Sequence, residues 1–75
     1  MADATLDAKG LNCPLPVLKA KKALRPLATD ETLEILATDP GSVPDFQAFC
    51  EATGFEMVES GEEAGVFRFL IRKTA

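Results

Sequence analysis

Hydrophobic and polar positions alternate near the N-terminus and then change to a helical spacing. The alternation over Thr5–Ala8 is typical of a short strand with one apolar face. From Pro14 to about Leu24, apolar residues recur every three or four positions, which predicts an amphipathic helix that Pro26 ends. The expected apolar face of this helix consists of Val17, Ala20, Ala23, Leu24 and Leu27.

The middle of the chain predicts a second strand and a second helix. Leu33, Ile35 and Ala37 share one face of the expected strand. The helix is predicted to run from about residue 43 to residue 53, with Gly54 as its left-handed C-terminal stop. The face of this helix that we expect to be buried carries Val43, Phe46, Phe49, Cys50 and Thr53.

A short polar loop leads into the second helix. Ser42 is followed three residues later by Asp45, which has the form of a capping box with an aspartate in place of the usual Glu or Gln. We therefore expect these two side chains to cap the start of the helix.

Two further strands complete the chain. Glu56–Ser60 and Val66–Lys73 are predicted to pair as a hairpin across a loop at residues 61–65. One side of the last strand carries Phe67, Phe69 and Ile71, and the other carries Arg68, Leu70 and Arg72. This alternation favours a sheet with one packed face and one wetter face.

The element order β-α-β-α-β-β defines the expected fold class. Strands joined through a helix should be parallel, with a right-handed crossover, and the hairpin adds an antiparallel pair. The sequence thus predicts an α/β (α+β) two-layer sandwich, with two helices packed on one face of a four-stranded mixed sheet. Seventy-five residues make one domain, residues 1–75, whose core must be thin.

Composition narrows the possible functions. The formal net charge of −4 argues against a sequence-independent hold on nucleic acid, which needs a basic surface. With no histidine and two cysteines, a Cys/His zinc site is nearly excluded, and we expect no metal or other cofactor. No stretch is long and apolar enough to span a membrane, and no leader pattern is present. We therefore expect a cytoplasmic protein whose thiols stay reduced.

Cys13 is the candidate reactive residue, because it stands where a strand-like segment gives way to a helix. The positive ends of the amide dipoles in the first helical turn would favour a thiolate there. Pro14 and Pro16 lack an N–H, so Leu15 and Val17 provide the nearest amide donors and the stabilisation should be moderate. A small buried cysteine is the other interpretation, but the junction after a glycine and an asparagine favours exposure.

Cys50 is interpreted differently. It lies on the apolar face of the second helix, four residues from Phe46, so we expect a protonated and inert thiol in the core. The sequence leaves a disulfide between Cys13 and Cys50 open, because it does not give the distance between them.

The polar side of the first helix is basic. Lys19, Lys22 and Arg25 share it, with Lys21 at the flank, and no acid interrupts them. Such a run is commonly a solvated face. The functional alternative is a docking surface for an acidic protein partner beside Cys13.

These residues resemble the TusA/SirA-like family of small sulfur-carrier proteins over nearly the whole chain. The resemblance is carried by the following segments: Leu6-Asp7-Ala8, Gly10-Leu11-Asn12-Cys13-Pro14-Leu15-Pro16, Asp39-Pro40-Gly41, Asp45-Phe46-Gln47-Ala48-Phe49-Cys50 and Phe69-Leu70-Ile71-Arg72-Lys73. It implies that Cys13, in the Cys-Pro-x-Pro motif, accepts sulfane sulfur as a persulfide and passes it on as a stoichiometric sulfurtransferase.

The resemblance also implies partners. Donors in this family are cysteine desulfurases or rhodanese-like proteins, and acceptors lead to thiolated tRNA, to molybdenum cofactor or, through DsrE-like carriers, to sulfur oxidation. We expect a monomer that binds proteins and does not bind nucleic acid directly. The competing hypothesis is a regulatory module that binds a protein through its basic helix. A dithiol oxidoreductase is less favoured, because the chain has no Cys-x-x-Cys pair.

Overall fold

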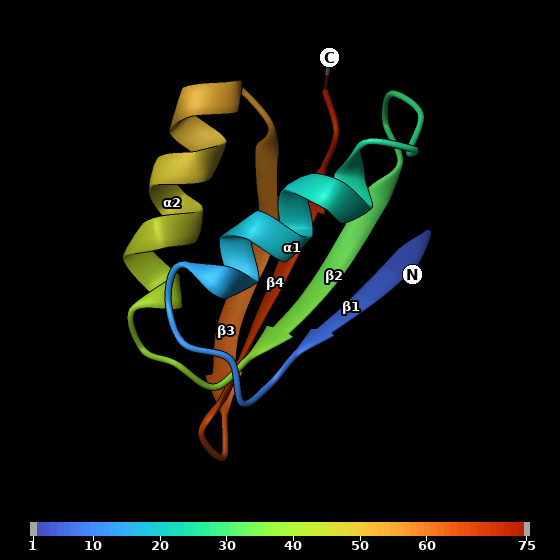
Figure 1. The fold of residues 1–75 in the computed structure, drawn as a ribbon. Coiled ribbons are helices and arrows are strands. Elements are labelled where there is room, and N and C mark those ends of the chain that lie inside the picture. Colours follow the sequence, from blue (N-terminus) through green and yellow to red (C-terminus); the bar gives the residue numbers. More distant parts are fainter. Residues whose placement is uncertain (1, 75) are drawn as a thin grey trace.

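The computed structural model describes residues 2–74, and within them the elements follow the predicted order. They are β1 (Ala4–Ala8), α1 (Leu15–Leu24), β2 (Thr32–Ala37), α2 (Ser42–Thr53), β3 (Glu56–Glu63) and β4 (Val66–Arg72). The sheet has the strand order β1-β2-β4-β3, and Figure 1 shows both helices on the same side of it. The predicted two-layer fold with a mixed sheet is therefore confirmed.

Strand pairing follows from the connections. The helical connection makes β1 and β2 parallel, with Leu6 opposite Ile35, as predicted. β4 pairs antiparallel with β2 on one side and with β3 on the other, so that Phe69 lies opposite both Ile35 and Ser60. β2 and β4 are thus the central strands, and their apolar side chains form the floor of the core.

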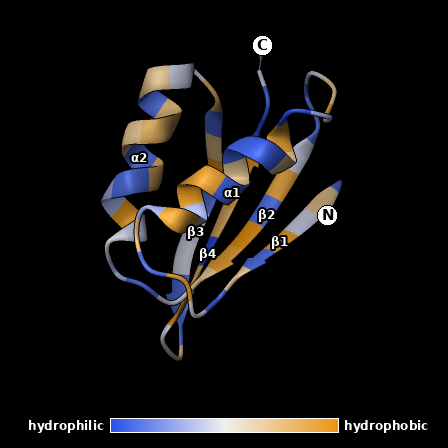
Figure 2. Ribbon diagram, in the orientation of Figure 1, coloured by the Kyte–Doolittle hydropathy of each residue, from blue (hydrophilic) through white to orange (hydrophobic). Residues whose placement is uncertain are grey.

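The core lies between this floor and the two helices. Phe46 of α2 is fully buried, and its ring centroid is 4.8 Å from that of Phe69. From α1, Ala20 and Leu24 are buried, and Val17 packs against the same cluster. Hydrophobic and hydrophilic positions interleave along both helices in Figure 2, as expected for elements that bury one side.

Helix α1 begins at Leu15, within the range expected from its two prolines, and ends at Leu24, just before Pro26. The sequence did not indicate how its C-terminus is satisfied. The Nζ atom of Lys73 donates hydrogen bonds of 2.9 Å to the carbonyls of Leu24 and Leu27. A cation here suits the negative end of the helix dipole and ties the end of the chain to α1.

Helix α2 does not begin with the capping box that the sequence predicts. Gly41 is the N-cap and no side chain caps this helix, so the expected capping box is wrong. Ser42 is already helical and buried, and its Oγ donates a 2.6 Å hydrogen bond to the carbonyl of Asp39. The carboxylate of Asp45 is engaged elsewhere, as described below.

The end of α2 agrees with the prediction in one respect and departs from it in another. Gly54 has φ 80° and stops the helix as expected. Thr53 is exposed rather than buried, because its hydroxyl bonds to the carbonyl of Phe49 at 2.8 Å instead of packing inward.

The hairpin is longer than the sequence indicated. β3 continues to Glu63, so the loop expected at residues 61–65 shrinks to a turn. Ala64 and Gly65 have φ values of 52° and 81°, the left-handed pair that a two-residue turn needs to match the strand twist. A register shift between Met57 and Glu59 interrupts the pairing and leaves Val58 exposed.

Ion pairs lie across the helix-free face of the sheet. Arg68 donates from Nε to Glu34 and, at 2.8 Å, from Nη1 to Glu59. Arg72 likewise bridges Asp30 and Glu56. The predicted contrast between a packed face and a wetter face is confirmed.

Candidate functional site

Cys13 lies in the loop between β1 and α1, two residues before the helix begins. It is exposed and its thiol is free. The loop that follows β2 runs beside it (Figure 1), and the N–H of Gly10 bonds to the hydroxyl of Thr38 across the two loops at 2.9 Å. Both loops leave the carboxyl ends of the parallel strands, which is where α/β folds commonly place their functional groups.

Asp39 fixes the backbone at Cys13. Its Oδ2 accepts the N–H of Cys13 at 2.6 Å, and its Oδ1 accepts the N–H of Gly41 at 3.1 Å. These hydrogen bonds, that of Cys13 first, lower the pKa of the Asp39 carboxyl. A side chain at position 41 would place its Cβ 3.4 Å from the Cβ of Cys13, so the two loops are in close contact.

The Cys13 sulfur donates a hydrogen bond to Oδ2 of Asp45, in the first turns of α2. This bond is the main reason that the pKa of the Cys13 thiol rises from 9.0 to about 11, with smaller effects from desolvation and from the negative charges of Asp45 and Asp39. The sequence predicted a thiol with its ionisation favoured by the helix start. That prediction is wrong, because the contact with Asp45 raises the pKa of the Cys13 thiol instead of lowering it.

The start of α1 explains why its dipole does not prevail. Pro14 occupies the N-cap position, and neither it nor Pro16 has an N–H to offer. The N–H of Leu15 is used by the carbonyl of Asn12 at 2.9 Å. The amides of positions 14 and 16 are therefore missing and that of Leu15 is occupied, while a carboxylate from the other helix reaches the sulfur.

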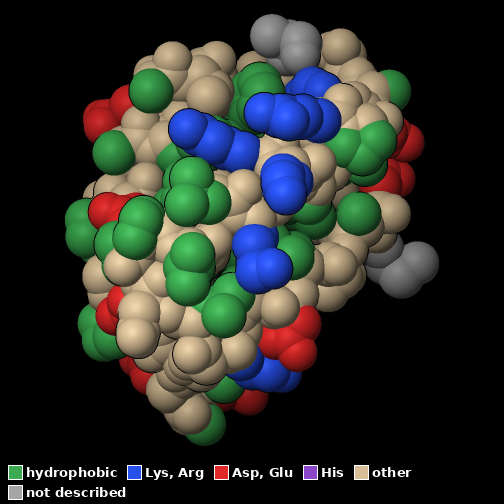
Figure 3. Space-filling model, in the orientation of Figure 1, with side chains coloured by type: hydrophobic (Ala, Val, Ile, Leu, Met, Phe, Trp, Pro, Cys, Tyr) green, Lys and Arg blue, Asp and Glu red, His purple; other side chains and the backbone are tan. Residues whose placement is uncertain are grey.

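The predicted docking residues lie on the surface. Lys19, Lys22 and Arg25 are exposed, and Figure 3 shows basic side chains gathered in a band over α1. Leu15 and Leu18 of the same helix are 45% and 49% exposed, so two large apolar residues also lie on this surface. Leu15 follows Cys13 by two positions, and the basic band starts at Lys19, further along the same helix.

Cys50 occupies the setting that the sequence predicted. It is buried in the core, and burial raises the pKa of its thiol. Both cysteines are free, so this structure contains no disulfide between Cys13 and Cys50.

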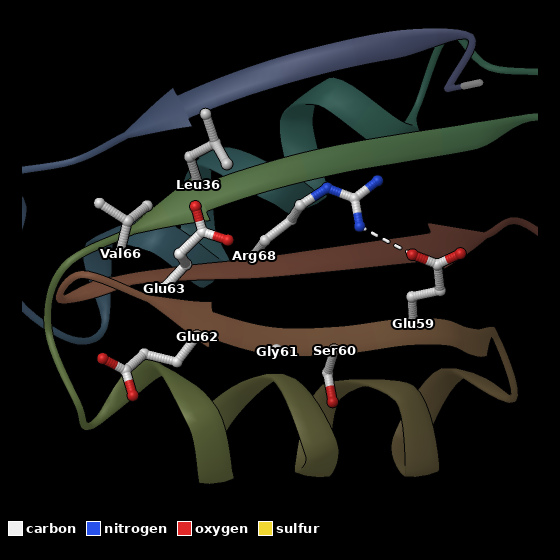
Figure 4. Close-up of a pocket in the computed structure, with 8 residues that line it drawn as sticks. All are labelled: Leu36, Glu59, Ser60, Gly61, Glu62, Glu63, Val66 and Arg68. Carbon is white, nitrogen blue, oxygen red and sulfur yellow. Dashed lines mark hydrogen bonds and ion pairs between the residues drawn. The ribbon is translucent and has the colours of Figure 1, made fainter.

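A shallow hollow of about 520 Å³ lies over the edge of the sheet formed by β3 and β4. In Figure 4, Arg68, Glu59, Glu63, Leu36 and Val66 point to the helix-free side, whereas Ser60 and Glu62 point toward the helices. None of the predicted site residues lines this hollow. Of its charged groups, Arg68 and Glu59 form an ion pair.

A second hollow, of about 390 Å³, lies between α1 and α2 and reaches the site. Pro14, Val17, Lys21 and Asp45 are among the residues that line it. Asp45 is half-buried at its edge, so a group that enters from outside can approach the carboxylate. Within residues 2–74, no helix combines the length and apolar character that crossing a membrane requires.

Sequence reasoning missed the roles of both carboxylates. The sequence predicts a capping role for Asp45 and assigns none to Asp39 beyond the family resemblance. The signal that could have found them is positional, since Asp39 follows a parallel strand at the same sheet edge as Cys13.

The fold and the site together define a small two-layer α/β protein that carries an exposed thiol on a loop fixed by carboxylates. A family model described as sulfurtransferase TusA matches residues 4–73. The chain is 57% identical over 72 residues to the sulfur carrier protein TusA of Allochromatium vinosum, covering 96% of this chain and 95% of that one. The chain belongs to the sulfurtransferase TusA family.

Other relatives agree. The sulfur carrier protein TusA of Pseudomonas aeruginosa is 48% identical over 73 residues, covering 97% of this chain and 92% of that one. A crystal structure of a SirA-like protein from Desulfitobacterium hafniense matches with a TM-score of 0.83 at 31% identity, covering 96% of this chain and 99% of that one. These findings confirm the family resemblance and the fold, and they support a general role in sulfur transfer.

Proposed function

We propose that this protein is a sulfur carrier that holds sulfane sulfur as a persulfide on Cys13. It accepts the sulfur from a donor protein, such as a cysteine desulfurase or a rhodanese, and relays it to an acceptor protein, such as a DsrE-like carrier. One observation carries the proposal. In a member of the TusA family, Cys13 is an exposed free thiol on a loop fixed by hydrogen bonds, whereas Cys50 is buried.

The chemistry is a form of thiol–disulfide exchange. Cys13 Sγ attacks the outer sulfur of a donor persulfide, and an acceptor thiol later attacks the outer sulfur that Cys13 has gained. The protein is a sulfurtransferase in a stoichiometric sense, since each molecule carries one sulfur at a time. An exposed loop suits this role, because Sγ must enter the active site of each partner.

The basic band of α1, formed by Lys19, Lys22 and Arg25, is the proposed docking surface for acidic partners. Charges of this kind act mainly on association rate and selectivity. The exposed side chains of Leu15 and Leu18 add apolar area next to the thiol. Pro14, Leu15 and Pro16 shape the loop-to-helix junction that presents Cys13.

We further propose that the carrier acts as a monomer in the cytoplasm, where reductants keep both thiols available. The pathway it serves, whether tRNA thiolation, molybdenum cofactor maturation or sulfur oxidation, depends on the partners encoded with it. No direct contact with nucleic acid is required of the carrier itself.

A loading experiment tests the proposal. The protein is incubated with a cysteine desulfurase and cysteine, and its intact mass is measured. We expect one added sulfur that a reductant removes, that is absent from Cys13→Ser and that is retained in Cys50→Ser. Equal loading of Cys13→Ser would overturn the assignment. No loading by this desulfurase or by a rhodanese with thiosulfate would instead favour a regulatory module that binds a protein through its basic helix.

A further inference from the structure

The Cys13 thiol is exposed, and its sulfur donates a hydrogen bond to Oδ2 of Asp45, which is an unusual setting for a nucleophile. Working cysteines commonly lie in electropositive surroundings. Here the charges acting on the thiol within residues 2–74 come from Asp45 on α2 and Asp39 in the preceding loop, and both disfavour ionisation. Lys21 of α1 lines the same hollow as Asp45.

The size of the pKa shift indicates how strongly the contact with Asp45 affects the reactivity of Cys13. With the pKa of Cys13 at about 11 rather than 9.0, the thiolate fraction at pH 7.5 is about 1 in 3,000 rather than about 1 in 30. The contact therefore restrains the thiol more than it activates it.

We propose that Asp45 determines the specificity of the carrier by holding the sulfur of empty Cys13 in a hydrogen bond until a docked partner pairs a cationic side chain with the Asp45 carboxylate. The inference rests on the proposed function. The hollow between α1 and α2 gives that cation its access, because Asp45 and Pro14 both line it. Small electrophiles and small persulfides in solution bring no such cation and meet a thiol of low reactivity.

The transfer itself balances around the sulfur of Cys13. When Asp45 is paired, Sγ loses its proton through solvent and attacks the outer sulfur of the donor persulfide. A new S–S bond forms at Sγ, the S–S bond of the donor breaks, and the donor cysteine leaves as a thiolate that takes up a proton. Sγ is oxidised from thiol to persulfide while the donor cysteine is reduced from persulfide to thiol.

Loading also changes the contact. The persulfidated Sγ of Cys13 carries no proton, so it can no longer donate to Asp45, and two acceptors in contact repel each other. The loaded sulfur is thereby freed from Asp45 for the acceptor. When the acceptor takes the outer sulfur, Sγ leaves as a thiolate, gains a proton from water and regains the hydrogen bond. The same residue thus distinguishes the empty carrier from the loaded one.

The test variant is Asp45→Asn. Its matched control is Glu51→Gln, which also removes one negative charge from α2 but at an exposed position. All proteins carry Cys50→Ser, so that Cys13 is the one thiol present. Alkylation by iodoacetamide is followed by intact mass from pH 6.5 to 10. At pH 7.5 we expect Asp45→Asn to react about tenfold faster, because about a hundredfold gain in thiolate is offset by about a tenfold loss of nucleophilicity.

The control Glu51→Gln should keep the pH profile of the parent, and the profile of Asp45→Asn should move to lower pH. Superimposable profiles for Asp45→Asn and the parent would overturn the proposal. Asp45→Ser serves as a second neutral variant if the asparagine variant does not fold, and the same outcomes apply to it.

A second measurement separates this inference from the proposed function. Each variant is loaded with sulfur either by a cysteine desulfurase or by a small organic persulfide, and the ratio of the two rates is compared. We expect the ratio to fall about tenfold in Asp45→Asn and to stay constant in Glu51→Gln. An unchanged ratio in Asp45→Asn would overturn the specificity role. If the parent does not load at all, the proposed function fails, while the alkylation profiles still decide whether Asp45 restrains Cys13.

Discussion

Cys13 and Cys50 are the same chemical group in two regions of one small fold, and both thiols are held protonated for different reasons. Cys50 is surrounded by apolar side chains, and burial raises its pKa. Cys13 is exposed, and a hydrogen bond to Asp45 is the main cause of its raised pKa. Burial is undone only when the fold opens, whereas a hydrogen bond at the surface is undone by a competing partner. Only the second arrangement can be reversed without opening the fold.

The two regions also differ in how they are built. The surroundings of Cys50 come from regular elements whose side chains pack together, with Phe46 and Phe69 at the centre. The surroundings of Cys13 come from two loops and the first turns of α2, joined by hydrogen bonds from Asp39 and Asp45. The core sets the stability of the fold, and the loops set the reactivity of the exposed thiol.

The largest expected effect comes from opening the region around Cys50. Phe46→Ala removes a fully buried ring, and we expect the free energy of unfolding to fall by about 3–5 kcal/mol. Such a loss is comparable to the total stability of many small domains. Urea denaturation measures it, and Cys13→Ser, at an exposed position, is the control that should leave the midpoint nearly unchanged. A loss below about 1 kcal/mol for Phe46→Ala would contradict the assignment of this ring to the core.

The next effect compares the two thiols directly. In the native protein at pH 7.5, we expect iodoacetamide to label Cys13 faster than Cys50 by on the order of a hundredfold. Labelling of Cys50 waits for opening that costs about 5 kcal/mol, whereas Cys13 loses only about tenfold relative to an ordinary thiol. Peptide mapping after short exposures gives the ratio. The Cys13 rate should rise with pH up to about 11, and urea should make the two rates similar. Equal labelling in the native state would remove the distinction between the regions.

The sequence was informative about the fold wherever packing sets the pattern. The spacing of Ala20 and Leu24 predicted the buried side of α1, and Gly54 marked the end of α2. The hairpin was less predictable, because β3 is an edge strand whose polar residues face solvent on both sides. Gly61 looked like a loop residue for that reason, although it pairs with Arg68 within the ladder.

The site was predicted only in part. The loop-to-helix junction identified Cys13, because that signal is local in the sequence. Its electrostatics were predicted with the wrong sign, since Asp45 lies 32 residues away and reaches the thiol only through the packing of α1 beside α2. A sequence pattern reports the dipole of the nearest helix, but it does not report a carboxylate supplied by another element.

A smaller effect is expected at the Asp39 carboxylate, which accepts the backbone N–H groups of Cys13 and Gly41. Hydrogen bonds from Cys13 and Gly41 lower the pKa of Asp39 below its ordinary value of 3.8. The stabilisation from the carboxylate is therefore present above pH 3.8 and is lost as the pH falls through the lower pKa of the folded state. We expect the NMR shift of the Cys13 amide to titrate below pH 3.8, and Asp39→Asn to abolish that titration. A Cys13 amide shift that responds neither to pH nor to Asp39→Asn would mean that the hydrogen bond from Cys13 to Asp39 is not formed in solution.

The smallest expected effect concerns the basic band of α1. Its removal tests whether the surface that binds partners extends from Cys13 along this helix. Lys19→Gln with Lys22→Gln should slow sulfur transfer from a cysteine desulfurase about threefold at low salt, because exposed charge pairs contribute only about 0.2–1 kcal/mol each. The difference should vanish at high salt, where such pairs are screened. Thr29→Glu with Ser60→Glu lowers the net charge by the same two units at exposed positions outside the band and should leave the rate unchanged. Equal slowing by both pairs would assign the effect to net charge, and no slowing by either would make the band a solvated face.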